Sequence, residues 1–222
     1  MPVALSSILD TLNPYGAKLI AVSKMHGPEA IAELYAQGQR DFGENWVQEL
    51  TEKQAKLPSD IHWHFIGHLQ TNKVKYIAPF VHLIHSVDSM KLLQEINKQA
   101  AKSNRVIPCL LEFKIAEEDS KHGLDLPAAI TLLESLELKA LSHIKIAGVM
   151  GMASFSDDEA QVRSEFGQLA NIFKTLKARF FEHDPDFKEI SMGMSGDYHL
   201  ALEEGSTMVR IGTLLFGERD YA

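Results

Sequence analysis

The sequence predicts an α/β fold, a (β/α)₈ TIM barrel that forms a single domain over residues 1–222, with an extra helix at the N-terminus. Eight short runs rich in apolar and β-branched residues alternate with segments of helical periodicity. Consecutive apolar positions in these runs are typical of parallel strands covered on both faces. A length of 222 residues is sufficient for one such barrel.

The first half of the chain contains four of the predicted strands. Breakers at residues 13–16 end the N-terminal helix, Pro28 opens the next helix, Gly38 ends it, and Thr71 is a candidate cap for a later one. We predict strands over residues 19–23, 41–43, 62–66 and 81–85, and helices over residues 3–12, 28–37, 46–57, 71–77 and 90–101.

The second half continues the alternation. The polar and acidic residues 156–159 cap a long helix that ends near residue 181, and residues 114–124 form a polar loop. We predict strands over residues 107–113, 145–150, 189–192 and 208–211, and further helices over residues 125–136 and 198–204. An open doubly wound sheet is the alternative, but it requires a glycine-rich loop after the first strand, where this chain has a lysine and one glycine.

Composition narrows the class of protein. The net charge of −8, from 30 acidic and 22 basic side chains, argues against a nucleic-acid partner. No apolar run approaches the length of a membrane span, and the N-terminus lacks the basic region of a secretion signal. Cys109 lies in an apolar run and is expected to pack rather than react. We expect a cytoplasmic monomer with no nucleic-acid or membrane partner.

Two ends of the chain carry the residues of a candidate site. In a barrel, functional residues lie at the carboxyl ends of strands, and Lys24 follows the first predicted strand. A lysine there, partly desolvated and near another cation, has a lowered pKa and can form a Schiff base with a carbonyl compound. A lone strand-end lysine is ordinarily just a solvated loop residue.

The last strand ends in a segment suited to phosphate. Gly212 and Thr213 offer backbone N–H groups and a hydroxyl, and Ser195 adds a second hydroxyl. Arg210 either faces this site or forms an outward salt bridge, and spacing does not separate the two. Asn45, between a strand and a helix, is expected from the sequence alone to cap that helix.

Other groups of residues match known catalytic or metal-binding motifs less well. The Gly-Met-Ser-Gly run at residues 193–196 lacks the second glycine of a hydrolase elbow, because Asp197 occupies that position. His62, His64 and His68 have no carboxylate or thiol at ligand spacing, so we predict no metal site. His64 is expected to face the barrel mouth or fill a core layer. Residues 120–123 are interpreted as a turn.

Taken together, the motifs resemble the pyridoxal phosphate homeostasis proteins, small barrels related to the N-terminal domain of alanine racemase. The resemblance covers nearly the whole chain. It rests on Ala-Val-Ser-Lys at residues 21–24, Phe-Gly-Glu-Asn at 42–45, Trp-His-Phe-Ile-Gly at 63–67, Leu69, Gln70, Asn72 and Lys73, Asp-Ser-Lys-His-Gly at 119–123, Ser-Met-Gly-Met-Ser-Gly-Asp at 191–197, Gly-Ser-Thr-Met-Val-Arg-Ile-Gly-Thr at 205–213, and Phe216 with Gly217.

The resemblance implies a fold-type III barrel that holds pyridoxal 5′-phosphate (PLP) as an internal aldimine on Lys24. It implies that Arg210 faces the pyridine nitrogen and that Asn45 lies beside the ring. Ser195, Gly212 and Thr213 would hold the phosphate; further expected contacts are Met194, His64, Ile66 and Ser86. Met25 and His26 depart from many relatives, which carry a lysine or similar polar residue just after the Schiff-base lysine.

The implied function is that of a PLP carrier or reservoir with little or no turnover. Racemases and decarboxylases of this fold add a β domain that supplies an acid/base residue, and residues 218–222 leave no room for one; Tyr198 or His199 could substitute. A PLP-dependent amino-acid racemase or other weak PLP enzyme is the alternative, and a phosphosugar barrel without PLP is a third. Expected recipients of the cofactor are apo PLP-dependent enzymes.

Overall fold

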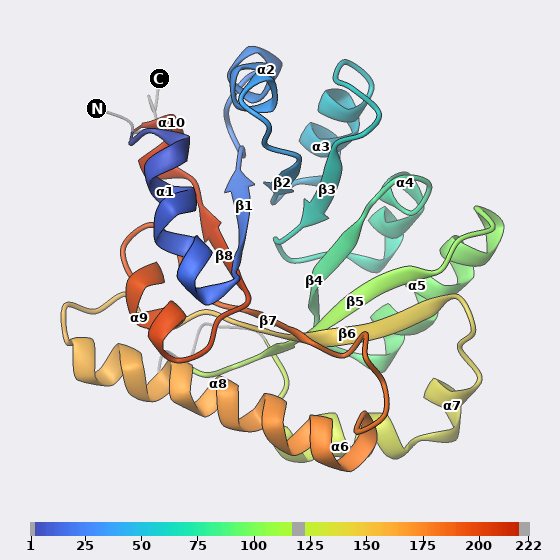
Figure 1. The fold of residues 1–222 in the computed structure, drawn as a ribbon. Helices are drawn as coiled ribbons and strands as arrows, with labels where there is room; N and C mark the ends of the chain where they lie inside the picture. Colours follow the sequence, from blue (N-terminus) through green and yellow to red (C-terminus); the bar gives the residue numbers. More distant parts are fainter. Residues whose placement is uncertain (1–2, 117–122, 218–222) are drawn as a thin grey trace.

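The computed structural model describes residues 3–116 and 123–217, in which the strands form a closed parallel barrel in chain order (Figure 1). The barrel closes because β1 pairs with β8, from Lys18 opposite Met208 to Ala21 opposite Ile211. This confirms the predicted (β/α)₈ barrel and excludes the open doubly wound sheet. The strands are β1 (Lys18–Val22), β2 (Asp41–Glu44), β3 (His62–Phe65), β4 (Leu83–Val87), β5 (Ile107–Phe113), β6 (Ile144–Gly151), β7 (Glu189–Ser191) and β8 (Met208–Ile211).

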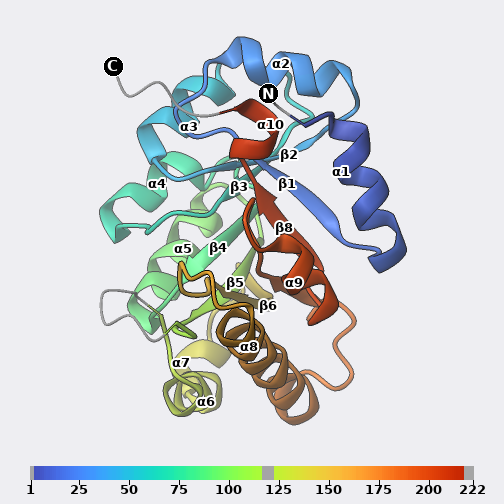
Figure 2. The same cartoon turned by 90° about the vertical axis from the view of Figure 1, so that its left-hand side faces the viewer.

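The helices lie around the outside of the strands (Figure 2). As predicted, an extra helix precedes β1. None of the helices in the described ranges combines the length and apolar character that crossing a bilayer requires. The helical elements are α1 (Leu5–Leu12), η1 (Asn13–Tyr15), α2 (Pro28–Ala36), α3 (Val47–Gln54), η2 (Thr71–Lys73), α4 (Val74–Ile77), α5 (Met90–Lys102), α6 (Leu126–Glu134), α7 (Leu136–Lys139), α8 (Glu159–Phe180), α9 (Tyr198–Glu203) and α10 (Thr213–Phe216).

The structure confirms one predicted helix cap and contradicts another, and it divides one predicted helix in two. Asp158 caps α8 as predicted, since its side chain accepts hydrogen bonds from the N–H groups of the first turn. Thr71 is not a cap, because it begins a 3₁₀ turn that leads into α4. The helix predicted over residues 125–136 is interrupted at Ser135, whose extended backbone and hydroxyl end α6 and cap α7.

The apolar residues form two layers. A large outer core lies between strands and helices and includes Cys109, which is buried as predicted. A small inner core fills part of the barrel and consists of Ile20, Leu83, Leu110, Ala147, Met150 and Met208. The remaining interior holds buried polar side chains, and these connect the two ends of the barrel.

Candidate functional site

Most of the predicted site residues lie at the carboxyl ends of the strands, here called the C-terminal rim. Lys24 follows β1 and Gly212 follows β8, and these two strands are paired neighbours. Ser86 lies within β4, because that strand begins two residues later than predicted. The other predicted residues at the rim are Asn45 after β2, Ile66 after β3, Met194 and Ser195 after β7, and Thr213 after Gly212.

The backbone on both sides of Lys24 is held in place. Ser23 donates its N–H to the Gly43 carbonyl over 3.0 Å and its hydroxyl to Glu44 Oε1 over 2.6 Å. Met25 adopts a left-handed backbone with φ of 67°, and its N–H donates to Glu49 Oε1 over 2.6 Å. Lys24, half-buried between them, therefore sits in a turn whose position is fixed.

A buried ammonium organises this turn. Lys53 Nζ from α3 donates to the Ser23 carbonyl over 2.7 Å and to Glu44 Oε1 and Glu49 Oε1 over 2.6 Å each. Burial raises the pKa of Glu44 to about 7, although Lys53 acts to lower it. Sequence reasoning missed this cluster, because Lys53 lies in an otherwise ordinary amphipathic helix.

The loops after β1, β7 and β8 adjoin one another. The Gly212 N–H donates to Ser195 Oγ over 3.3 Å. A Cβ atom at position 212 would lie 3.0 Å from the Val22 carbonyl oxygen, so this close approach favours glycine. His26 stacks on Phe216 with a centroid separation of 4.8 Å, which ties the turn after Lys24 to α10.

The donor groups beside Lys24 suit a phosphorylated carbonyl compound. Ser195 is half-buried and Thr213 is exposed, and both carry hydroxyl donors. Thr213 is the first residue of α10, so its amide has no partner within the helix. Neutral donors of this kind bind phosphate oxygens, and the amine of Lys24 is the group that condenses with a carbonyl. The residues present therefore fit the cofactor that the sequence predicts.

Arg210 points into the barrel rather than outward, which decides between the two orientations left open by the sequence. Arg210 is 4% exposed, and its guanidinium donates from Nη1 to Ser191 Oγ over 2.6 Å and from Nη2 to the Gly151 carbonyl over 3.0 Å. Burial lowers the pKa of Arg210 to about 10, so the group stays protonated at neutral pH.

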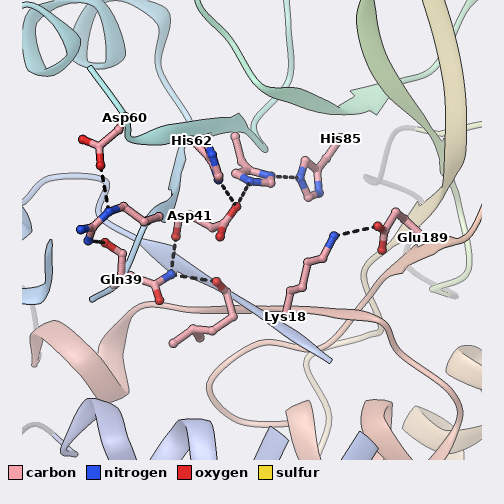
Figure 3. A network of polar contacts seen from close by, with 10 residues as sticks. Lys18, Gln39, Asp41, Asp60, His62, His85 and Glu189 are labelled. Atoms are coloured by element: carbon pink, nitrogen blue, oxygen red, sulfur yellow. Dashed lines mark hydrogen bonds and ion pairs between the residues drawn. The ribbon is translucent and has the colours of Figure 1, made fainter. Parts of the chain in front are cut away.

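A chain of hydrogen bonds runs from Arg210 across the barrel to the start of β2. Figure 3 shows its far part, between His85 and Asp41. Ser191 Oγ lies 2.9 Å from His85 Nδ1, and His85 Nε2 lies 2.9 Å from His64 Nδ1. His64 Nε2 in turn lies 3.0 Å from Asp41 Oδ1. We call these five residues the Arg210–Asp41 chain.

The direction of donation along this chain follows from its two ends. Burial acts to raise the pKa of Asp41, but interactions with His64 and His62, the hydrogen bond from His64 first among them, lower it overall, so the carboxylate accepts. Burial also lowers the pKa of His64 and of His85, so each imidazole is neutral and has one donor and one acceptor nitrogen. Arg210 can only donate. Every bond therefore donates toward Asp41, and both histidines carry their proton on Nε2.

His64 fills a polar layer of the core and does not face the C-terminal rim. It is 1% exposed, and both ring nitrogens are used within the chain. We therefore do not retain His64 as a cofactor contact. No carboxylate adjoins His62 and His64 in the sequence, yet Asp41 from the neighbouring strand accepts hydrogen bonds from both.

Asn45 does not cap α3, contrary to expectation. The N-cap position is Trp46, and no side chain caps the helix. The Asn45 Oδ1 atom is buried and has no hydrogen-bond partner among the described residues. Asn45 also lines a cavity of about 640 Å³ beside α3, whose lining includes neither Lys24 nor Arg210. An unsatisfied buried acceptor next to the rim is consistent with a ligand contact.

Glu112 is a buried carboxyl group that sequence reasoning missed and whose charge acts on Arg210. It is 5% exposed, and burial raises its pKa to about 7; the charge of Asp88 acts in the same direction and that of Arg210 opposes it. A single carboxylate in the apolar run of β5 was the available signal.

Of the two residues considered as substitutes for a second acid/base group, Tyr198 packs in the outer core and His199 is exposed. Apart from Gly123, the predicted turn at residues 120–123 lies outside the described residues.

Comparison with known proteins identifies similar chains over almost the full length. Residues 5–220 match the family described as alanine racemase, N-terminal domain. The pyridoxal phosphate homeostasis protein of Aquifex aeolicus is 43% identical over 92% of this chain and 88% of its own length. That of Homo sapiens is 37% identical over 92% of this chain and 78% of its own length.

Solved structures agree with the sequence comparisons. PipY of Synechococcus elongatus PCC7942 without PLP has a TM-score of 0.89 and 38% identity to this chain. The same protein with PLP bound has a TM-score of 0.86 and 37% identity. Both comparisons cover 96% of this chain and 98% of the PipY chain.

The direction of the Arg210–Asp41 chain can be measured in the protein without ligand. We predict that His64 and His85 are both neutral at neutral pH and carry Nε2–H, because burial lowers the pKa of each. Imidazole nitrogen shifts in ¹⁵N NMR report both the tautomer and the protonation state. A protonated imidazole or an Nδ1–H tautomer at either position would contradict the assignment.

The raised pKa of Glu44 predicts a pH-dependent stability. Because the folded pKa of about 7 exceeds the usual 4.5, the folded state keeps a proton that the unfolded state has lost between these values. The free energy of unfolding therefore falls as pH rises through this interval, by up to roughly 3 kcal/mol from Glu44, and levels off above it.

Glu44→Gln should reduce this fall. The readout is the difference between urea unfolding energies at about pH 5 and about pH 7.5, since the buried amide also shifts stability at every pH. Glu112 remains in the variant and keeps part of the slope. An unchanged difference would show that Glu44 does not titrate in this range.

Proposed function

The chain belongs to the alanine racemase N-terminal domain family and, within it, to the pyridoxal phosphate homeostasis proteins, and from this premise we propose that it binds PLP and acts in PLP homeostasis as a carrier. The proposal rests on one observation. The pairing of β1 with β8 places Lys24 beside Ser195, Gly212 and Thr213, whose hydroxyl and N–H groups can donate hydrogen bonds to a phosphate. PLP supplies an aldehyde that reacts with amines and a pyridine ring that withdraws electrons.

Each residue has a role in this proposal. The amine of Lys24 makes the covalent attachment, while the Ser195 and Thr213 hydroxyls and nearby backbone N–H groups hold the phosphate. Arg210 faces the pyridine nitrogen. Because a guanidinium only donates, the nitrogen there must accept and stays unprotonated, which weakens electron withdrawal by the ring. That property suits a protein that stores the cofactor.

The remaining predicted contacts support the rim. Asn45 Oδ1 would accept from a ligand donor, and Met194, 38% exposed, would cover the ligand. Ser86 donates to the Gly67 carbonyl over 2.5 Å, so it joins β4 to the end of β3. Ile66 packs beside Gly43, where an added Cβ would lie 3.2 Å from Ile66 Cδ1. Ser86 and Ile66 thus shape the rim on the β2–β4 side.

The alternative is a PLP-dependent amino-acid racemase or another weak PLP enzyme. One observation favours it: Glu112, with a pKa near 7, is suited to acid–base chemistry and interacts with Arg210. The carrier is preferred because curated relatives 43% and 37% identical to this chain are named for homeostasis. Recipients of the cofactor would be apo PLP-dependent enzymes.

We predict that purified protein incubated with PLP turns yellow and that Lys24→Ala abolishes the absorption band of the attached cofactor. Lys56→Ala is the matched control, because Lys56 is exposed and lies beside the same turn. The control should keep the full band. A Lys24→Ala protein that still acquires it would contradict the assignment of Lys24.

A carrier and an enzyme would differ in the rate at which they exchange the α-protons of amino acids with solvent. With a panel of amino acids in deuterated water, the PLP-loaded protein should exchange α-protons no faster than free PLP does. Fast exchange with one amino acid, reduced in Glu112→Gln, would overturn the carrier proposal and identify Glu112 as the acid–base group.

A further inference from the structure

We propose that Asp41, His62 and His82 form a binding site for a divalent transition-metal ion of the Zn²⁺ class at the N-terminal mouth of the barrel, the end opposite Lys24. Asp41 and His62 are the first residues of β2 and β3, and His82 directly precedes β4. Figure 3 shows the Asp41 carboxylate directed toward His62. This site shares no residue with the proposed PLP site.

The distances among these side chains suit one ion. Each offers a ligand atom, and the three atoms lie within 4.8 Å of one another. Asp41 Oδ1 lies 3.2 Å from His62 Nδ1. Two ligands on a tetrahedral zinc ion, each about 2.0–2.1 Å from the metal, are separated by about 3.3 Å. The rings of His62 and His82 stack at 4.5 Å with an angle of 20°, so only small rotations are needed for both to reach one ion.

The backbone that carries the three residues is rigid. Asp41 and His62 are direct partners in the β2–β3 ladder. The His82 N–H donates to the Trp63 carbonyl over 2.8 Å, which anchors it beside β3. Ligands on paired strands hold their geometry better than ligands on loops.

A buried neighbour orients the carboxylate. His64 Nε2 donates to Asp41 Oδ1 over 3.0 Å, and metal-binding carboxylates are typically held by such hydrogen bonds. On metal binding, His62 would move its ring proton to Nε2 so that Nδ1 becomes the ligand, and the imidazole stays neutral. The Arg210–Asp41 chain would thereby end on a metal ligand.

The surroundings permit a cation and favour a transition metal. Three lysines, Lys18, Lys145 and Lys188, border the space next to His82. Lys18 Nζ is paired with Glu189 Oε1 at 3.0 Å, and Lys145 is paired with Asp186. A cavity of about 310 Å³ bordered by His82, Lys18 and Glu189 gives space for water to complete the coordination. Two imidazoles and one carboxylate select zinc, cobalt, nickel or copper over magnesium and calcium.

The test uses the full chain without an affinity tag, first stripped with a chelator. Zn²⁺ is titrated calorimetrically, and Co²⁺ is followed by its visible absorption. We expect one ion per chain, and His62→Ala and His82→Ala should each weaken binding at least about tenfold. Both side chains are exposed, so both variants should fold. His183→Ala, another exposed histidine, is the matched control and should bind as the parent does.

The proposal fails if neither ion binds, if both variants keep the parent affinity, or if His183→Ala loses binding to the same extent. Because His62 and His82 lie outside the Arg210–Asp41 chain, both variants should still acquire the PLP absorption band. Loss of metal binding with the band intact separates this site from the proposed cofactor site.

Discussion

The pairing of β1 with β8 is the constraint on which the candidate site depends. It places the turn that carries Lys24 beside the segment that carries Gly212 and Thr213, residues from opposite ends of the chain. The contact is close, because Gly212 lies against the Val22 carbonyl with little space for a side chain. Closing the barrel therefore both completes the fold and brings an amine to the phosphate donors.

Burial of Arg210 imposes a second constraint. A buried guanidinium is costly unless its donors are satisfied, and its nearest partners, Ser191 and the Gly151 carbonyl, are neutral. The carboxylates whose charges act on Arg210 are Asp197 and Glu112. The hydrogen bonds of Ser191 continue through His85 and His64 to the carboxylate of Asp41. This explains why a barrel with an apolar inner core also contains a polar layer. It also joins the two mouths of the barrel, so a change at one end has a defined path of contacts to the other.

The sequence predicted the barrel, all eight strands and the rim location of Lys24, because these follow from local periodicity and from the rule that strand ends carry function. The Arg210–Asp41 chain could not be predicted. Its residues come from β2, β3, β4, β7 and β8, and these strands face a common interior only once the barrel is closed. Asparagine is a residue type that commonly caps helices, yet in the structure Trp46, not Asn45, occupies the N-cap position of α3. Lys53 was missed for the same reason: two of its three partners lie on β2 and in the turn after β1.

The central claim is that Lys24 holds the cofactor at this rim. The most direct measurement is borohydride reduction of the PLP-treated protein, followed by proteolysis and mass-spectrometric mapping of the modified lysine. We predict one modified peptide, containing Lys24, and protection of Lys24 when inorganic phosphate competes for the rim. Modification of a different lysine, or several lysines modified to a similar extent, would contradict the account.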